Sequence, residues 1–470
     1  AFNPAPPLAP PLPPPPPPPM HFSDGTVARA VLRGDASGGP LVSNRLSPGD
    51  NFGVSLAALP DLDGDGRGEI AVGADRCEAE AGGGSRIGSV YLFHPDAGGS
   101  ATRFTKLPDP QSGDRMCFGC AVAHLADLDG DGQLLAVGAC QENEAGEGAG
   151  AVYVLLLDQA LSTKQWRKIK PDLGGGVQRF GGSLASPGDC DGDGVADLLV
   201  GGEGELGGVW LVTLDADNSF AAKERTLLLS ALEVGLPQTA RFGAALAAGA
   251  QDASGGFTLY VGAPGAESDA GAVYAVRLAR PSGGGAVRMV GRPAKLAMPL
   301  GGGGRRALQS GGGEQFGSAL ALVTSDWDGN GAPQLLVGAP GAADGGAGSG
   351  AVFTLFLDDG GNGAGYGRHQ KVSAGEGGLA AALDGTQLPA AGAAFGRAVA
   401  SLGTLDADEV SDVAVGANHD AARADGGGGL YLLFMSASGT QPPLVPPLPS
   451  PPPSPPSPPP PPSPPSPSPP

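Results

Sequence analysis

Short groups of apolar residues, each about five to eight residues long, recur along residues 21–440 and are separated by glycine-rich polar segments. Many of these groups are rich in β-branched and aromatic residues, and no helical period lies between them. Such short runs, bounded by glycine and aspartate, are typical of β-strands joined by tight turns. We therefore expect a large all-β domain.

The apolar groups are organised in a repeated unit with four parts. Each unit begins with Phe-Gly, at positions 52–53, 118–119, 180–181, 242–243, 316–317 and 395–396. A second apolar segment ends in Val-Gly-Ala or Val-Gly-Gly, at 72–74, 137–139, 200–202, 261–263, 337–339 and 415–417. A third contains Val-Tyr or a similar pair, at 90–91, 152–153, 209–210, 273–274, 352–353 and 430–431, and a less regular fourth stretch follows. Six copies of a four-stranded unit predict a six-bladed β-propeller, with its blades numbered one to six in chain order.

The order Phe-Gly, Asp-x-Asp-Gly-Asp-Gly, Val-Gly-Ala and Gly-x-Val-Tyr resembles the FG-GAP repeat of integrin α-subunit head domains. Integrin heads have seven blades, whereas this chain has six copies, and its last copy lacks a fourth strand. Residues 26–32 have the alternating apolar pattern of such a strand and precede the first copy. We expect them to join the last blade and close the ring, which would remove exposed sheet edges.

The loop between the first two strands of a unit has the spacing of a calcium site. Calcium takes six to eight oxygen ligands, and a tight loop can supply them from positions 1, 3, 5, 7 (a backbone carbonyl) and 9. Blades one and three have complete loops, formed by Asp61, Asp63, Asp65, the carbonyl of Arg67 and Glu69, and by Asp189, Asp191, Asp193, the carbonyl of Val195 and Asp197. Asp-Gly also favours ordinary hairpin turns, but two complete copies at matching positions favour calcium.

Three further blades have reduced versions of this loop, so we expect one to three weaker calcium sites beside the two complete ones. Blade five keeps the oxygens with less charge, in Asp326, Asp328, Asn330, the carbonyl of Ala332 and Gln334. Blade six has Asp406, Asp408 and Asp412, with Thr404 in the first position. Blade two has Asp127, Asp129 and Asp131 but is one residue shorter, and blade four lacks the pattern.

The charge of the chain limits its partners. The formal net charge is −20, from 48 acidic and 28 basic residues, and no basic stripe occurs in the sequence. Nucleic acid is therefore not expected as a partner. No apolar run approaches the length of a membrane span. The chain begins with Ala1 rather than Met, from which we infer a signal peptide that has been removed.

The five cysteines are Cys77, Cys117, Cys120, Cys140 and Cys190, all in the first half of the repeat region. Cys117 and Cys120 form a Cys-x-x-Cys pair, which also occurs in redox and zinc sites. A second such pair and a histidine cluster are missing from the sequence. We expect structural disulfides, two at most, with one thiol left over.

Both ends of the chain are rich in proline, which divides it into an arm over residues 1–20, the propeller over 21–440 and a Ser/Pro-rich arm over 441–470. Proline runs adopt the extended polyproline II conformation. The Ser-Pro-Pro composition resembles the hydroxyproline-rich glycoproteins of green-algal and plant cell walls, particularly the pherophorin-like proteins. That resemblance implies hydroxylated and O-glycosylated arms, and no Asn-x-Ser/Thr acceptor occurs in the chain.

These features favour an extracellular matrix or cell-wall structural glycoprotein, in which a calcium-stabilised propeller is an interaction platform. The arms would tether it or assemble it into fibres, and its partners would be other matrix or cell-wall glycoproteins or further copies of the chain. The alternative is an adhesion or carbohydrate-binding, lectin-like module at the cell surface. The histidines do not recur beside a serine or cysteine nucleophile, so we expect no enzymatic activity.

Overall fold

The computed structural model describes most of the chain between Val27 and Met435. The described residues are 27–33, 49–76, 88–99, 101–111, 117–125, 133–158, 161–171, 177–204, 207–215, 220–281, 285–299, 313–323, 325–328, 330–358, 365–383, 388–406, 410–419 and 428–435. The predictions for the two proline-rich arms, for the loop of blade two, for Cys77 and for Asp408 lie outside these ranges.

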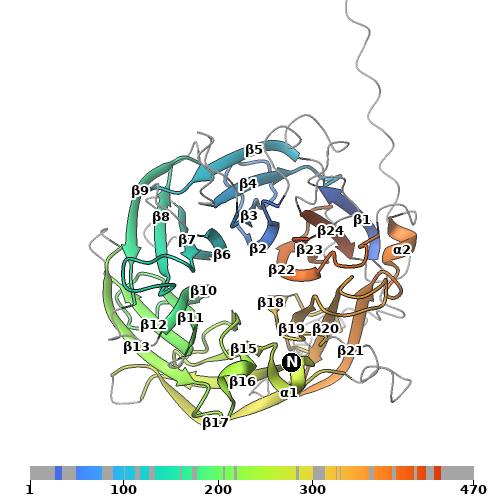
Figure 1. Cartoon of the computed structure of the whole chain (residues 1–470). Coiled ribbons are helices and arrows are strands. Elements are labelled where there is room, and N and C mark those ends of the chain that lie inside the picture. The colour runs from blue at the N-terminus through green and yellow to red at the C-terminus, as the bar shows by residue number, and fades with distance from the viewer. Residues whose placement is uncertain are drawn as a thin grey trace, which may run out of the picture.

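The described strands form six antiparallel four-stranded sheets arranged in a ring, as the sequence predicts (Figure 1). Blade one contains β2 (Phe52–Ala58), β3 (Ile70–Ala74), β4 (Ser89–Pro95) and β5 (Ala101–Pro108). Blade two contains β6 (Phe118–Leu125), β7 (Gln133–Ala139), β8 (Ala151–Leu157) and β9 (Thr163–Ile169). Blade three contains β10 (Val177–Gly188), β11 (Asp197–Gly204), β12 (Gly208–Leu214) and β13 (Ala222–Ser230).

The second half of the ring repeats this plan with three short helical turns added. Blade four contains β14 (Ala245–Ala248), β15 (Phe257–Ala263), β16 (Ala272–Ala279) and β17 (Arg288–Ala297). Blade five contains β18 (Ala319–Val323), β19 (Gln334–Ala339), β20 (Ala351–Leu357) and β21 (Tyr366–Ser373). Blade six contains β22 (Phe395–Gly403), β23 (Asp412–Ala417), β24 (Gly429–Met435) and β1 (Val27–Arg33). The helical turns are η1 (Gln238–Ala240), α1 (Ala266–Asp269) and α2 (Leu379–Ala382).

The ring is closed by its first strand. β1 pairs antiparallel with β24 as the outer strand of blade six, with Ala30 opposite Leu433 and Arg33 opposite Leu430. The predicted closing strand at residues 26–32 is therefore confirmed, with a shift of one residue. The innermost strand of blade one, β2, lies beside β6 on one side and β22 on the other, so the ring is continuous (Figure 1).

The recurring phenylalanine of Phe-Gly packs inside its own blade. In all six blades its ring lies edge-on against the aromatic residue of the third strand, with ring centroids 5.1 to 5.8 Å apart. Phe180 and Trp210 of blade three are an example, and both are buried. Edge-to-face contacts add to the free energy gained by burying two large rings. This packing explains why Phe-Gly and Val-Tyr recur together.

The glycines of the repeat fit one blade against the next. A Cβ at Gly73 would lie 2.0 Å from the carbonyl oxygen of Gly119, the Phe-Gly glycine of the following blade. Gly119 itself has a φ of +93°, a conformation that glycine adopts readily and other residues rarely do. The equivalent glycines of the other five blades approach each other equally closely, including Gly416 and Gly53 where the ring closes.

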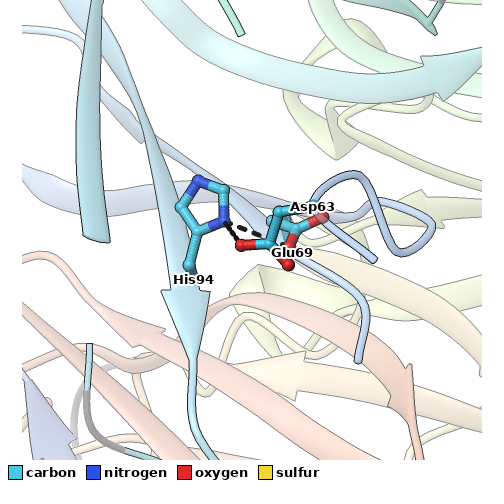
Figure 2. Close-up of side chains that lie close together, drawn as sticks. All are labelled: Asp63, Glu69 and His94. Carbon is cyan, nitrogen blue, oxygen red and sulfur yellow. Dashed lines mark hydrogen bonds and ion pairs between the residues drawn. The ribbon is translucent and has the colours of Figure 1, made fainter. Parts of the chain in front are cut away.

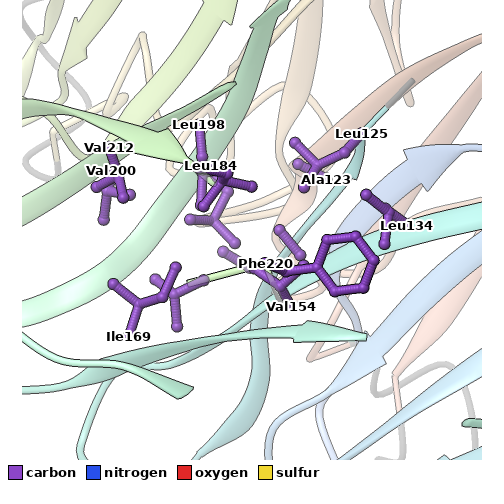
Figure 3. Close-up of a cluster of buried hydrophobic side chains, with 14 of the residues drawn as sticks. Ala123, Leu125, Leu134, Val154, Ile169, Leu184, Leu198, Val200, Val212 and Phe220 are labelled. Atoms are coloured by element: carbon purple, nitrogen blue, oxygen red, sulfur yellow. The ribbon is translucent and has the colours of Figure 1, made fainter. Parts of the chain in front are cut away.

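The hydrophobic core lies between the blades, in six clusters that each join two neighbours. Figure 3 shows the cluster between blades two and three, where Leu134 and Val154 of one blade face Leu184 and Leu198 of the next. The outermost strands are more exposed, since β17 has only one buried residue among its ten. Within the described residues, none of the helices is long and apolar enough to span a bilayer.

Candidate divalent-cation site

The aspartate loops share one face of the ring. In blade one Phe52 pairs with Ala74 and Ala58 pairs with Ile70, so the loop of residues 59–69 lies at the opposite end of the hairpin from Phe-Gly. The hairpins of blades three, five and six have the same pairing. The described side chains that the sequence assigns to calcium are therefore on the face opposite the Phe-Gly ends.

In blade one, backbone N–H groups orient the first aspartate of the loop. Asp61 Oδ1 accepts hydrogen bonds from the N–H groups of Gly64 (2.7 Å) and Asp65 (3.2 Å), and its Oδ2 accepts one from Gly66 (2.8 Å). These bonds, that from Gly66 foremost, lower the pKa of Asp61, which stays ionised. Carboxylate oxygens of Asp61, Asp63 and Asp65 lie within 4.8 Å of one another. Three like charges so close together favour the binding of a cation.

A histidine lies beneath this loop. His94 on β4 is buried, and its Nδ1 lies 3.1 Å from both Asp63 Oδ2 and Glu69 Oε1, as Figure 2 shows. Glu69 is also buried, and its Oε2 accepts the N–H of Leu62 at 2.7 Å. One oxygen or nitrogen from each of Asp63, Glu69 and His94 lies within 4.8 Å of the other two. The inner side of the blade-one loop therefore offers an imidazole nitrogen as well as carboxylate oxygens.

Blade three holds its loop in nearly the same way. Asp189 accepts the N–H groups of Gly192 (2.5 Å) and Gly194 (2.9 Å), as Asp61 does in blade one. Asp197 is fully buried and accepts the N–H groups of Cys190 (2.7 Å) and Leu214 (3.2 Å). The pKa of Asp197 is raised to about 7, by burial foremost and by the nearby Asp191 and Asp189, although the two backbone hydrogen bonds lower it. Oxygens of Asp189, Asp191 and Asp197 lie within 4.8 Å of one another, so these residues fit a divalent cation.

A lysine neutralises part of the blade-three loop. Lys223 on β13 places its Nζ 2.8 Å from Asp191 Oδ2 and 3.4 Å from Asp193 Oδ2. An ammonium group there occupies oxygens that the sequence assigns to calcium. Arg67 plays a smaller part in blade one, with its Nη1 3.3 Å from Asp65 Oδ2.

Replacing Lys223 is expected to strengthen calcium binding at blade three. In Lys223→Met the ion no longer competes with the ammonium group for Asp191 and Asp193, so we expect about threefold higher affinity at this site. Isothermal titration calorimetry with calcium measures it. Lys295→Met is the control, because Lys295 is exposed on β17 opposite Tyr274, on the face of the ring away from the aspartate loops. An unchanged affinity in Lys223→Met would show that the lysine does not contact the carboxylates in solution.

The ninth loop residue closes the loop in four blades. Glu69, Asp197, Gln334 and Asp412 each accept a hydrogen bond from the N–H of the second loop residue, at 2.7 to 3.2 Å. Asp412 accepts a further bond from the N–H of Met435 at 3.0 Å. A carboxylate has about four lone-pair sites, so such bonds leave capacity for a cation. The ninth residue thus stabilises the turn through its hydrogen bond and can also be a ligand of a bound ion.

In blade five, amide hydrogens lie where the other loops have only oxygens. Gln334 Nε2 donates to the carbonyl of Ala332 at 3.1 Å, and Asn330 Nδ2 donates to the carbonyl of Leu357 at 2.9 Å. Two of the five predicted ligands are therefore already joined to each other. Asp326 still accepts the N–H of Gly331 at 2.7 Å, and Arg368 lies 3.8 Å from Asp328. The weaker calcium site predicted here stays a prediction, and an ion would have to displace the Gln334 bond.

The loop of blade six is described only in part. Asp412 is buried and bound by backbone N–H groups, whereas Asp408 lies outside the described residues. Asp406 Oδ1 is buried, and among the described residues it has no hydrogen-bond partner. An oxygen in this situation fits a cation ligand.

The four described cysteines are thiols, so the prediction of structural disulfides is wrong for them. Cys190 is the second residue of the blade-three loop, whereas Cys117 and Cys140 lie at the Phe-Gly end of blade two. The two faces of the ring separate Cys190 from the others, beyond the reach of a disulfide. Cys120 accepts the N–H of Cys140 through its sulfur at 3.2 Å. The Cys117 thiol lowers the pKa of Cys140, but its contact with Cys120 and its burial outweigh this effect and raise the pKa, so Cys140 stays neutral.

Two contacts of the site were not predicted from the sequence. His94 and Lys223 reach the loops from the third and fourth strands, 31 and 32 residues away from the aspartates they contact. His94 follows Val-Tyr in the third apolar segment of blade one, and no other blade has a histidine at that position. This was the only feature of the sequence that could have indicated its role.

The six blades and their aspartate loops define a β-propeller of the integrin-like FG-GAP kind. The family model described as "FG-GAP repeat" matches residues 52–93, the first three strands of blade one. Integrin alpha-3 of Cricetulus griseus is 34% identical over 186 residues, which cover 36% of this chain and 16% of that protein. Integrin alpha ina-1 of Caenorhabditis elegans is 32% identical over 185 residues, covering 34% of this chain and 15% of that protein. The chain thus matches about a sixth of the length of these relatives.

Solved structures overlap the chain more loosely. A mutant of Aleuria aurantia lectin in complex with alpha-methyl-L-fucoside has a TM-score of 0.41 and 10% identity, and the overlap covers 79% of this chain and 89% of the lectin. The NanB sialidase of Streptococcus pneumoniae has a TM-score of 0.47 and 8% identity, with 86% of this chain and 70% of the sialidase covered.

Proposed function

We propose that the protein is an extracellular interaction module of the adhesion type, with a propeller stabilised by calcium. The observation that supports this most is the convergence of Asp61, Asp63 and Asp65 within 4.8 Å in a loop held by backbone donors. The similarity to integrin α chains over a third of the sequence supports the adhesion class. The proposal gives the protein no catalytic role.

Calcium is the proposed ion because the convergent carboxylate ligands are hard oxygens in a short loop. Asp61, Asp63, Asp65 and Glu69 would hold it in blade one, and Asp189, Asp191, Asp193 and Asp197 in blade three. The ion would neutralise carboxylates that otherwise repel one another, and it would fix the loop against the adjoining blade. Its role is structural.

Calcium removal is expected to lower the melting temperature of the protein. Extracellular calcium sites have Kd values of about 10⁻⁴ to 10⁻³ M, so about 2 mM calcium adds on the order of 1 kcal/mol of unfolding free energy per bound ion. Thermal melts in calcium and in EGTA measure the difference.

The matched variants are Asp61→Asn with Asp189→Asn, and Asp252→Asn as the control. Asp252 occupies the corresponding loop of blade four, where it pairs with Arg277 instead of other carboxylates. The double variant should lose the response to calcium and the control should keep it. If calcium raised the melting temperature of the double variant as much as that of the control, the ions would not be bound by these two loops.

We further propose that the protein works in an extracellular matrix or cell wall, where its proline-rich arms tether it or join it into fibres. The position of the propeller between two proline-rich arms supports this role, because extended proline has little conformational entropy to lose on docking. Electron microscopy of the native material should show propeller-sized beads connected in regular fibres. Isolated beads at every concentration would show that the arms tether the protein without joining it into fibres. A repeated sugar preference on a glycan array would favour the lectin-like alternative.

A further inference from the structure

The Phe-Gly face of the ring, opposite the aspartate loops, carries two sets of residues that recur in every blade. The first precedes Phe-Gly and consists of Asn51, Cys117, Arg179, Arg241, Gln315 and Ala394. The second follows Val-Gly-Ala or Val-Gly-Gly and consists of Asp75, Cys140, Glu203, Pro264, Pro340 and Asn418. All six members of the first set have a φ between 49° and 59°. Their side chains therefore leave the backbone in equivalent directions around the ring.

Members of the two sets contact each other within and between blades. Asn51 Nδ2 donates to Asp75 Oδ1 at 3.0 Å in blade one. Glu203 Oε1 lies 3.6 Å from Arg179 Nε of its own blade and 3.7 Å from Arg241 Nε of blade four. The side chains of one blade thus reach those of the next at this end of the axis.

A third arginine comes from blade six. Arg397 on β22 follows Phe-Gly directly. It lies near the Cys140 thiol and near three charged side chains that act on it electrostatically, those of Arg241, Asp75 and Arg179. These four residues belong to blades two, four, one and three. One side chain is near residues of so many blades only if it lies at the axis, which the innermost strands surround (Figure 1). The three guanidinium groups therefore converge on the axis.

Among the described residues that these interactions join, positive charge exceeds negative charge. Arg76, Arg179, Arg241 and Arg397 are opposed by Asp75 and Glu203. Burial first, and then the nearby arginines Arg76 and Arg397, lower the pKa of His419, which is neutral at pH 7. Such an excess is unusual in a chain whose formal net charge is −20.

The three guanidinium groups have few partners of opposite charge, because Arg179 and Arg241 share the single carboxylate of Glu203 at 3.6 and 3.7 Å. In the part of the chain that the structure describes, Arg179 Nε is buried without a hydrogen bond. Arg397 is half-buried, and no ion pair or hydrogen bond joins its side chain to any described residue. Burial lowers the pKa of Arg397, and Arg241 beside it lowers it further. An oxyanion would relieve this repulsion, because guanidinium groups bind carboxylate and sulfate in a two-pronged geometry.

We propose that the Phe-Gly end of the propeller axis binds an oxyanion, the carboxylate or sulfate group of a ligand, between Arg179, Arg241 and Arg397. The site uses residues of three blades and lies on the face opposite the aspartate loops. It therefore does not depend on calcium binding or on the proposed adhesion role.

Isothermal titration calorimetry with sodium sulfate and with sodium glucuronate, at constant ionic strength in chloride, tests the proposal. The intact chain should bind at least one of the two anions saturably, and which one it binds identifies the group. Arg397→Gln should weaken this binding at least tenfold. Arg288→Gln is the matched control, since Arg288 is exposed on β17 of the outer edge, and it should bind as the intact chain does.

Thermal melts give an independent readout. The bound anion should raise the melting temperature of the intact chain and of Arg288→Gln, but not of Arg397→Gln. Without anion, Arg397→Gln should melt no lower than the intact chain, because the substitution removes a repelling charge. Should Arg397→Gln fail to fold, Arg179→Gln replaces it with the same expectation. Absence of saturable binding to either anion, or equal binding by the arginine variants, would overturn the proposal.

Discussion

Deleting residues 1–34 is expected to turn the protein into an aggregating one with greatly reduced stability. The deletion removes β1, the outer strand of blade six, and with it six paired positions along β24. The loss of these ladder bonds costs on the order of 5 kcal/mol of unfolding free energy. It also leaves the edge of β24 open to pairing with another chain. Size-exclusion chromatography and thermal melts measure both effects.

The control is deletion of residues 1–25, which removes the proline-rich segment and leaves β1 intact. This shorter deletion should remain monomeric and melt as the intact chain does. The comparison separates the closing strand from the arm that precedes it. A monomeric protein with unchanged melting after the longer deletion would show that β1 does not close the ring.

Replacing Gly73 with alanine is expected to cost about 3 kcal/mol of unfolding free energy, the upper part of the range for overpacked sites. The added Cβ would lie 2.0 Å from the carbonyl oxygen of Gly119 and 2.2 Å from Ser55 Oγ. The oxygen of Gly119 belongs to the backbone of the next blade, so blades one and two would have to move apart. Urea unfolding at constant m-value measures the change.

Gly375→Ala is the matched control for this substitution. Gly375 is exposed, and a Cβ there would make ordinary contacts, the nearest at 3.5 Å from the carbonyl oxygen of Asp344. We expect its unfolding free energy to change by less than about 0.5 kcal/mol. Equal stability of Gly73→Ala and Gly375→Ala would mean that the blades are not packed as closely as the structure shows.

The fold was predictable because each blade is encoded locally. Phe52 and Tyr91 belong to one blade, and their pairing recurs six times in the sequence at corresponding places. The role of β1 was predictable for the same reason, since the last copy lacked a strand and the first copy was preceded by one. The loop ligands from Asp61 to Glu69 lie within nine consecutive residues, so their spacing alone indicates the site.

The rest of the candidate sites depends on contacts between distant strands or blades. His94 and Lys223 reach their loops from other strands, and the arginine cluster forms only when blades three, four and six meet at the axis. The sequence also does not show whether an amide side chain donates or accepts a hydrogen bond at a given place. Gln334 has the length of a glutamate, but it donates a hydrogen bond to Ala332 where a glutamate could only accept.

The number of calcium ions bound per chain shows directly whether the aspartate loops of blades one and three each hold one ion. Equilibrium dialysis with radioactive calcium at about millimolar concentration measures it. We expect two ions of highest affinity per chain, with Asp61→Asn and Asp189→Asn each removing one of them. Failure of the intact chain to bind calcium, or two ions still bound by the double variant, would contradict it.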